Sequence, residues 1–253
     1  LDTVMQPEVL EQQMQQINDI YFKVFDELYD IIREGDEMAF CYFSSWAPGK
    51  MSKLQSDIST MISQDDYRRF VQPFIREQCR KIDYTLYHLD GVGAMHHLPA
   101  LLEIDELNAI QWTPGVGEPQ GGSPKWYDLY RKILAAGKSV MACWVTLDEL
   151  KPLLDAIGGD GVHIEMDFHN EKEVEQAMKI VEEYTSKVNS EAVGETGEKQ
   201  NSVNDTELEK IKIDRVSEKS DEALQPLFDA IVGGRLESAV EVTKQAIADG
   251  VAP

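Results

Sequence analysis

The chain has 253 residues, with 24 basic and 46 acidic side chains and a formal net charge of -22. This balance argues against binding to nucleic acid or to anionic membrane surfaces, because phosphate groups are bound by clustered lysine and arginine. The hydrophobic share of 42% is ordinary and predicts a folded core. No apolar run reaches the roughly 18 residues of a transmembrane helix. Three widely spaced cysteines, Cys41, Cys79 and Cys143, indicate a reduced, cytoplasmic protein and not a disulfide scaffold.

The first predicted element is a helix. Apolar residues recur at steps of three and four from Leu10 to Ile31, which places them on one helix face, and Gly35 is a natural stop. We expect this helix to cover the core. The chain starts without an initiating Met and without the layout of a signal peptide. We therefore expect it to be a piece of a longer protein.

The next stretch predicts two extended segments and a helix. Residues 39–43 and 53–58 read as strands separated by a turn. Ser63 and Asp66 then have the spacing of a capping box, which predicts the start of a helix. Pro73 falls inside this helix, where its ring should introduce a kink.

The middle of the chain alternates strands with helices. Strands are predicted at 84–89, 109–112, 138–144 and 161–166, and helices at 97–102, 126–136, 146–157 and 174–184. This alternation predicts an α/β fold with a parallel sheet, and the near-equal spacing favours a (β/α) barrel over a doubly wound sheet. About five core strands are predicted, whereas a closed barrel needs eight. Either the sheet is open, or the first units lie upstream of Leu1.

The C-terminal part changes character. Residues 186–221 are mostly Glu, Lys, Ser, Asn and Gly, which predicts an acidic, solvated linker. Residues 222–253 predict two short amphipathic helices, which need partners to bury their apolar faces. We expect an all-α segment there that belongs to a second domain.

Polar side chains collect where the predicted strands end. In parallel β/α folds these ends meet at one edge of the sheet, where ligands bind. The candidate residues at these ends are Asp57, His88, Asp90, Gln111, Trp112 and Glu165. A hydrophobic core does not require polar residues at the ends of several strands, so the set as a whole indicates a site. Each member alone could still be structural.

The sharpest local pattern is His88-x-Asp90. On a strand, residues i and i+2 face the same side, so both side chains could reach one ligand, proton or metal. A metal would need a third donor, for which Glu165 is one candidate; a general acid or base held by a carboxylate is the other interpretation. His97, in the helical stretch after the glycines at 91 and 93, is either a substrate contact or a structural residue.

Three motifs carry a resemblance to a known family: LQSDIS at 54–59, YHLDG at 87–91 and IQWTPG at 110–115. Together they resemble the uroporphyrinogen decarboxylase superfamily, in particular its corrinoid-dependent methyltransferases, over residues 8–184. The resemblance implies that residues 1–185 form the C-terminal part of a TIM (β/α)8 barrel that is incomplete at its N-terminus.

The last residues resemble a second family. LFDAIV at 227–232 and AIADGVAP at 246–253 are similar to the start of the helical cap of corrinoid-binding proteins. This resemblance implies a corrinoid (cobalamin) cofactor on an adjoining domain or partner protein. A linker between the two domains would raise their effective concentration.

One departure from the family bears on metal content. Zinc-dependent members of the branch use a His-x-Cys pair where this chain has His88-x-Asp90, and they have a later Cys, whereas the last predicted strand of this chain carries Glu165-Met166-Asp167 and no Cys. The thiolate ligands that hold zinc are therefore absent, which makes a zinc cofactor doubtful.

The resemblance implies an enzyme that moves a methyl group between a small methylated compound, of methylamine or methoxy type, and a protein-bound corrinoid. His88 and Asp90 would polarise or protonate the methyl-bearing group, and Asp57 with Glu165 would make the pocket acidic. Gln111, Trp112 and His97 would contact the substrate. Two alternatives stay open: a decarboxylase acting on a carboxylated tetrapyrrole, and a non-catalytic binding module.

Overall fold

The computed structural model describes residues 6–33, 37–38, 43 and 45–195. The chain divides into two units, of which the first comprises Leu1–Phe22 and Glu34–Gly197 and the second comprises Lys23–Arg33 and Glu198–Pro253. In the second unit only Lys23–Arg33 is described, and it forms the C-terminal part of helix α2. The predicted strand at 39–43 and the predicted helices at 222–253 lie outside the described residues, except that Phe43 is in a turn.

Helix α2 spans Pro7–Ile32, which confirms the predicted N-terminal helix. Its buried face differs from the predicted stripe: Asn18, Phe22, Phe25 and Tyr29 are buried, whereas Ile17 is 62% exposed. The buried positions follow the same helical spacing, rotated by one residue, and three of these four side chains are aromatic.

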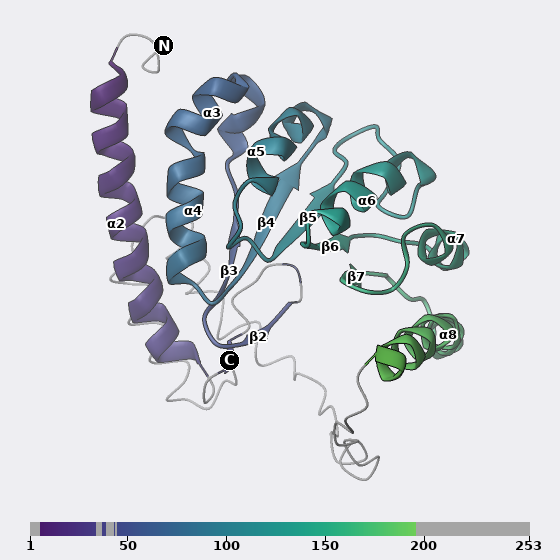
Figure 1. The fold of residues 1–253 in the computed structure, drawn as a ribbon. Helices are drawn as coiled ribbons and strands as arrows, with labels where there is room; N and C mark the ends of the chain where they lie inside the picture. Colours follow the sequence, from purple (N-terminus) through teal and green to yellow (C-terminus); the bar gives the residue numbers. More distant parts are fainter. Residues whose placement is uncertain (1–5, 34–36, 39–42, 44, 196–253) are drawn as a thin grey trace. The chain divides into compact units, whose positions relative to one another are not determined.

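The main sheet has five parallel strands in strictly sequential order. They are β3 Met51–Leu54, β4 Tyr84–Asp90, β5 Ala109–Thr113, β6 Ser139–Ala142 and β7 Val162–Ile164. A separate antiparallel pair joins β1 Glu37–Met38 to β2 Ala47–Pro48. Figure 1 shows β3, β4, β5 and β6 side by side, with the helices between them in sequence. The predicted α/β class is confirmed, and the described strands form an open sheet.

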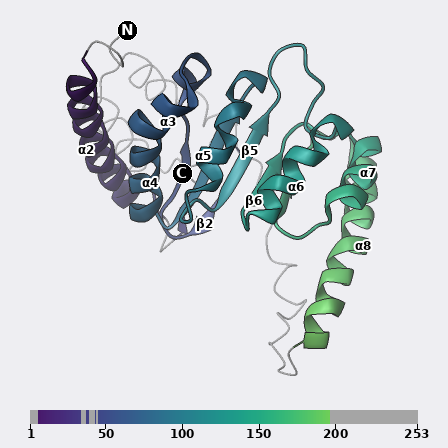
Figure 2. The ribbon, with the colours of Figure 1, turned by 45° about the horizontal axis from the view of Figure 1, so that its top comes forward.

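Helices or helical turns connect successive strands. The α-helices are α3 Gln64–Phe70, α4 Gln72–Lys81, α5 Leu98–Leu102, α6 Tyr127–Ala135, α7 Leu147–Ile157 and α8 Glu171–Glu195; short 3-10 helices cover Asp57–Met61, Val92–His97 and Pro124–Trp126. Their buried apolar residues pack in one cluster with alternate strand residues such as Leu54, Leu89 and Ile110. Figure 2 shows α4, α5 and α6 in front of the sheet. The other face carries a smaller cluster that includes Met51, Leu86 and Met141, and none of its described members lies in a helix.

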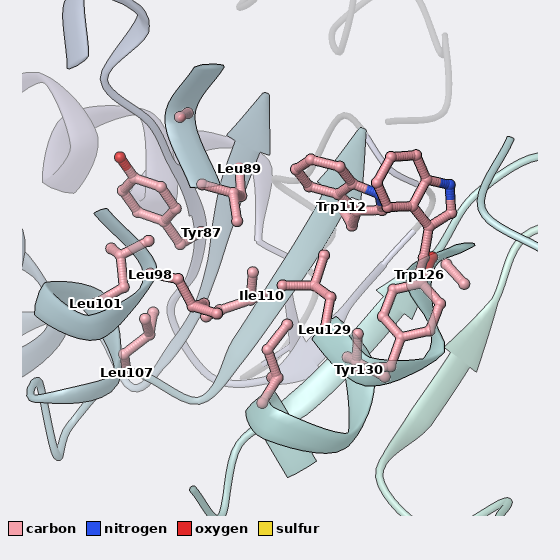
Figure 3. Close-up of a cluster of buried hydrophobic side chains, with 14 of the residues drawn as sticks. Tyr87, Leu89, Leu98, Leu101, Leu107, Ile110, Trp112, Trp126, Leu129 and Tyr130 are labelled. Atoms are coloured by element: carbon pink, nitrogen blue, oxygen red, sulfur yellow. The ribbon is translucent and has the colours of Figure 1, made fainter. Parts of the chain in front are cut away.

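The core under the helices is dense with large side chains. Figure 3 shows Trp112 from β5 beside Trp126, with Leu129 and Tyr130 of α6 below them. The two indole rings lie edge to face with centroids 5.1 Å apart, and both side chains are buried. Aromatic pairs in this geometry stabilise a core by about 0.5–1.5 kcal/mol beyond the area they bury.

Two local predictions are wrong. The strand predicted at 53–58 ends at Leu54, and Asp57 starts a 3-10 helix instead. Pro73 does not kink a continuous helix, because α3 ends at Phe70 and α4 begins at Gln72, which places Pro73 in the first turn of the new helix. Proline is tolerated there, since the first-turn N–H groups have no partner within the helix.

The predicted helix caps are confirmed. The Ser63 side chain accepts a hydrogen bond from the Asp66 N–H at 3.1 Å, as a capping box requires. At the start of α7, where Thr146 and Glu149 also have capping-box spacing, the Glu149 side chain accepts a hydrogen bond from the Thr146 N–H at 3.1 Å. Each cap satisfies N–H groups that a helix start leaves unpaired.

Helix α8 continues to Glu195, ten residues beyond the boundary predicted at 185, so the start of the predicted linker is helical. Residues 196–221 lie outside the described part of the chain. None of the described helices is both long and apolar enough to cross a membrane.

Candidate functional site

Three predicted catalytic residues line one pocket at the C-terminal ends of β3 and β4. The pocket has a volume of about 190 Å³. Asp57, His88 and Asp90 form its polar wall, together with hydroxyl groups of the 3-10 helix that follows β3. The error in the strand boundary therefore does not separate Asp57 from the other two residues.

His88 is held from both sides. Its side chain is 13% exposed, and its Nε2 atom lies 3.8 Å from Oδ2 of Asp90, whose side chain is 52% exposed. On the other side of the ring, Nδ1 contacts Oε1 of Gln111. The ring also lies against Phe43, with the two centroids 5.1 Å apart. The i, i+2 spacing on β4 thus brings His88 and Asp90 to the same side, as predicted.

Gln111 is fully buried and makes contacts at both ends of its amide. Besides the contact of Oε1 with His88, Nε2 donates to Thr113 Oγ1 at 2.8 Å and to Cys143 Sγ at 3.3 Å. Because β4, β5 and β6 are parallel and in register at His88, Gln111 and Met141, these side chains share one sheet face. The sequence did not indicate that Thr113 and Cys143 hold Gln111, since neither residue type signals this role.

Asp57 belongs to a second hydrogen-bonded chain. Both of its carboxylate oxygens accept from Nε2 of Gln55 at 2.9 Å, and Oε1 of Gln55 accepts from the Lys53 ammonium. The nearby Tyr87 hydroxyl has its pKa raised to about 12, first by burial and further by the negative charge of Asp57, although the hydrogen bond from Tyr67 lowers it. Asp57 therefore has two effects near β4: its charge raises the pKa of Tyr87, and its side chain lines the pocket.

Trp112 lies on the opposite sheet face from Gln111. Adjacent residues of a strand point to opposite sides, so only one of the two can face His88. Trp112 is buried in the core beneath the helices, and its indole N–H has no hydrogen-bond partner within the described residues. We therefore leave Trp112 out of the site.

His97 is also away from the pocket wall. It is buried, its Nε2 contacts the Ser59 carbonyl oxygen at 2.6 Å, and its ring stacks on Tyr67 with centroids 4.3 Å apart. Burial lowers the pKa of His97, with a smaller opposing effect of the Ser59 hydrogen bond. The bond to Ser59 joins the 3-10 helix at 92–97 to the one at 57–61. Of the two roles that the sequence left open for His97, these contacts fit the structural one.

Glu165 extends the pairing of β6 with β7, since its N–H donates to the Ala142 carbonyl at 2.9 Å. Its Oε2 atom is buried without a hydrogen-bond partner among the described residues, and Glu165 does not line the pocket of His88. Its neighbour His163, which the sequence analysis did not single out, has its pKa lowered by burial, while the Glu165 charge opposes this shift. The structure thus places Glu165 near His163 and not with His88.

Within the described residues, no three His, Cys, Asp or Glu side chains converge in a way that could hold a metal ion. Comparisons of the chain with models of protein families, with curated proteins and with solved structures find no match.

Proposed function

We propose that this chain is part of a (β/α) barrel methyltransferase that moves a methyl group between a small methylated compound and a protein-bound corrinoid. One observation carries the proposal: Asp57, His88 and Asp90 line a single pocket at the C-terminal ends of parallel strands. Ligands bind at this end of β/α folds, and a histidine beside a carboxylate is suited to general acid–base catalysis.

The strand order supports the barrel. In a doubly wound sheet the order reverses at a switch point, and helices cover both faces. Here the order from β3 to β7 is sequential, and among the described residues the helices that share a buried cluster with the strands pack against one face. A barrel that continues beyond β3 or β7 has this arrangement.

The pocket fits the small substrate and not the cofactor. A volume of about 190 Å³ holds a compound of a few heavy atoms and is too small for a corrinoid ring. Residues 222–253, which resemble the start of a corrinoid-protein cap, would belong to the adjoining domain that holds the cofactor. When bound, the corrinoid cobalt accepts or donates the methyl group.

The chain's own residues would then act on the methyl donor. When the bond between the methyl carbon and its nitrogen or oxygen breaks, the electron pair stays on that atom. An oxygen left in this way needs a proton, whereas the nitrogen of a protonated amine leaves as a neutral amine. His88 and Asp90 lie where they can hold or transfer this proton.

The test is a methyl-transfer assay with the natural full-length protein and reduced cobalamin, using methylamine and methoxy donors. Transfer from at least one donor is expected, and its absence with all of them would refute the proposal. Turnover of uroporphyrinogen in the same preparation would support the decarboxylase instead.

A further inference from the structure

The buried amide of Gln111 determines which nitrogen of His88 carries a hydrogen. Its Nε2 side meets two partners, Thr113 Oγ1 and Cys143 Sγ, and its Oε1 side meets one, His88 Nδ1. This orientation uses both N–H groups of the amide. The reversed orientation would aim two hydrogens at the single acceptor of His88 and leave one unpaired in a fully buried place, which is unfavourable.

His88 Nδ1 must therefore donate to Gln111. In the neutral ring, Nε2 is then unprotonated and acts as an acceptor. This nitrogen lies on the side of Asp90, whose carboxylate is 3.8 Å away, and both residues line the pocket. His88 Nε2 therefore presents a lone pair, and not an N–H group, to the pocket.

The other charged groups around the pocket are acceptors as well. Asp57 and Asp90 contribute carboxylates, and none of the described residues that line the pocket is a lysine or an arginine. The ammonium group of Lys53 on β3 is bonded to Gln55, which presents its amide N–H to Asp57. A ligand that brings hydrogen-bond donors and positive charge suits this wall, and an anion does not.

We propose that the pocket of Asp57, His88 and Asp90 binds a small protonated amine, a methylated ammonium ion, and that Gln111 positions His88 for this purpose. This inference rests on the proposed function and names its substrate class. The ammonium N–H groups donate to His88 Nε2 and to the carboxylates. The donor carries its own proton, so the amine leaves neutral once its methyl group is transferred, and His88 has no proton to supply.

The experiment uses the full chain labelled with ¹⁵N in its 5 histidines, which keeps the spectrum simple. A His88→Gln variant identifies the His88 signals. In the neutral ring, Nδ1 of His88 is expected to carry the hydrogen. Titration with methylammonium and trimethylammonium chloride should shift the Nε2 signal saturably, whereas tert-butanol, a neutral compound of similar shape, and sodium acetate should not.

Gln111→Leu removes the acceptor for Nδ1–H, so His88 should become a mixture of tautomers and ammonium affinity should fall about tenfold. Gln72→Leu is the matched control. Gln72 is another buried glutamine, which donates to the Ala100 carbonyl at 2.7 Å, and it does not line the pocket. This variant should leave the His88 tautomer and the affinity unchanged, and it shows whether losing a buried amide is harmful in itself.

A hydrogen on Nε2 of the wild-type ring, or binding of acetate as tight as that of methylammonium, would overturn the inference. The outcome is separable from that of the methyl-transfer assay. Ammonium binding without transfer would refute the methyltransferase and leave the inference intact. Transfer from methoxy donors alone would support the methyltransferase and refute the inference.

Discussion

At the scale of single residues, the alternation of side chains along a strand explains most of the site. It brings His88 and Asp90 together and sends Gln111 and Trp112 to opposite faces. The pairing of His88 with Asp90 was predictable from their spacing alone. The burial of His97 was not predictable, because the sequence does not show that Ser59, 38 residues away, and Tyr67 enclose it.

The lowered pKa of His97 predicts a loss of stability in acid. Burial favours the neutral ring in the folded state, so the unfolded chain binds the proton more tightly. Stability is then complete above about pH 6.5, the usual pKa of histidine, and falls as the pH decreases. His97→Phe keeps a ring against Tyr67 and should make this decrease shallower, by at most about 1.4 kcal/mol per pH unit. Urea unfolding at pH 7.5, 6 and 5 measures it, and equal slopes for both proteins would contradict the assignment.

The raised pKa of Tyr87, about 12, predicts the opposite behaviour in alkali. The unfolded chain loses the phenol proton near pH 10, before the folded state does, so stability falls as the pH rises above about 10. Tyr87→Phe should reduce this slope. The matched control is Tyr84→Phe on the same strand, where the side chain is 38% exposed. If both variants follow the wild-type curve between pH 9 and 11.5, Tyr87 is not the group responsible.

At the scale of elements, capping patterns predicted the helix starts well, whereas the end of one strand, β3, was predicted poorly. The caps depend on residues three positions apart, as at Ser63 and Thr146. The end of β3 at Leu54 depends instead on where β4 stops pairing with it, at Tyr87. Such a long-range constraint is not visible in a local pattern.

One close approach between elements makes a sharp prediction. A Cβ atom at Gly121 would lie 2.5 Å from the Cys143 carbonyl oxygen and 2.9 Å from its nitrogen, both backbone atoms at the end of β6. Gly121→Ala should therefore lower the free energy of unfolding by roughly 2 kcal/mol or more.

Gly93→Ala is the control for this change, because the nearest atom to its Cβ would be a Thr60 methyl carbon at an ordinary 3.6 Å. It should change the free energy of unfolding by less than about 0.5 kcal/mol. Denaturant titration measures the free energy of unfolding of both variants. Equal decreases would contradict the prediction and show that the backbone near Gly121 shifts to accommodate the added Cβ atom.

At the scale of the whole molecule, alternating patterns predicted an α/β fold and about five strands, and the structure has five parallel strands in sequence order. Closure into a barrel stays a prediction, because it depends on units that would pair with the edges of β3 and β7. The candidate site was likewise predictable only in part. The sequence indicated which strand ends carry polar groups, and the structure shows that Glu165 at β7 does not join the pocket at β4.

The sheet predicts a gradient of hydrogen exchange. Strand β5 is paired on both sides, whereas β7 is paired only with β6 among the described strands. The amides of Gln111 and Trp112 should therefore exchange more slowly than that of His163, since edges open without global unfolding. Equal protection across the sheet would indicate that another segment covers the β7 edge.

The central claim is that His88 acts in methyl transfer at the C-terminal edge of the sheet. The most direct measurement is the rate at which the natural full-length protein methylates reduced cobalamin from a methylammonium donor, compared with the His88→Gln variant. Because His88 Nε2 accepts a hydrogen bond from the ammonium donor and such a bond to a charged group contributes about 1.5–3 kcal/mol, the variant should be at least about tenfold slower while its unfolding curve is unchanged. Equal rates in the two proteins would contradict the account.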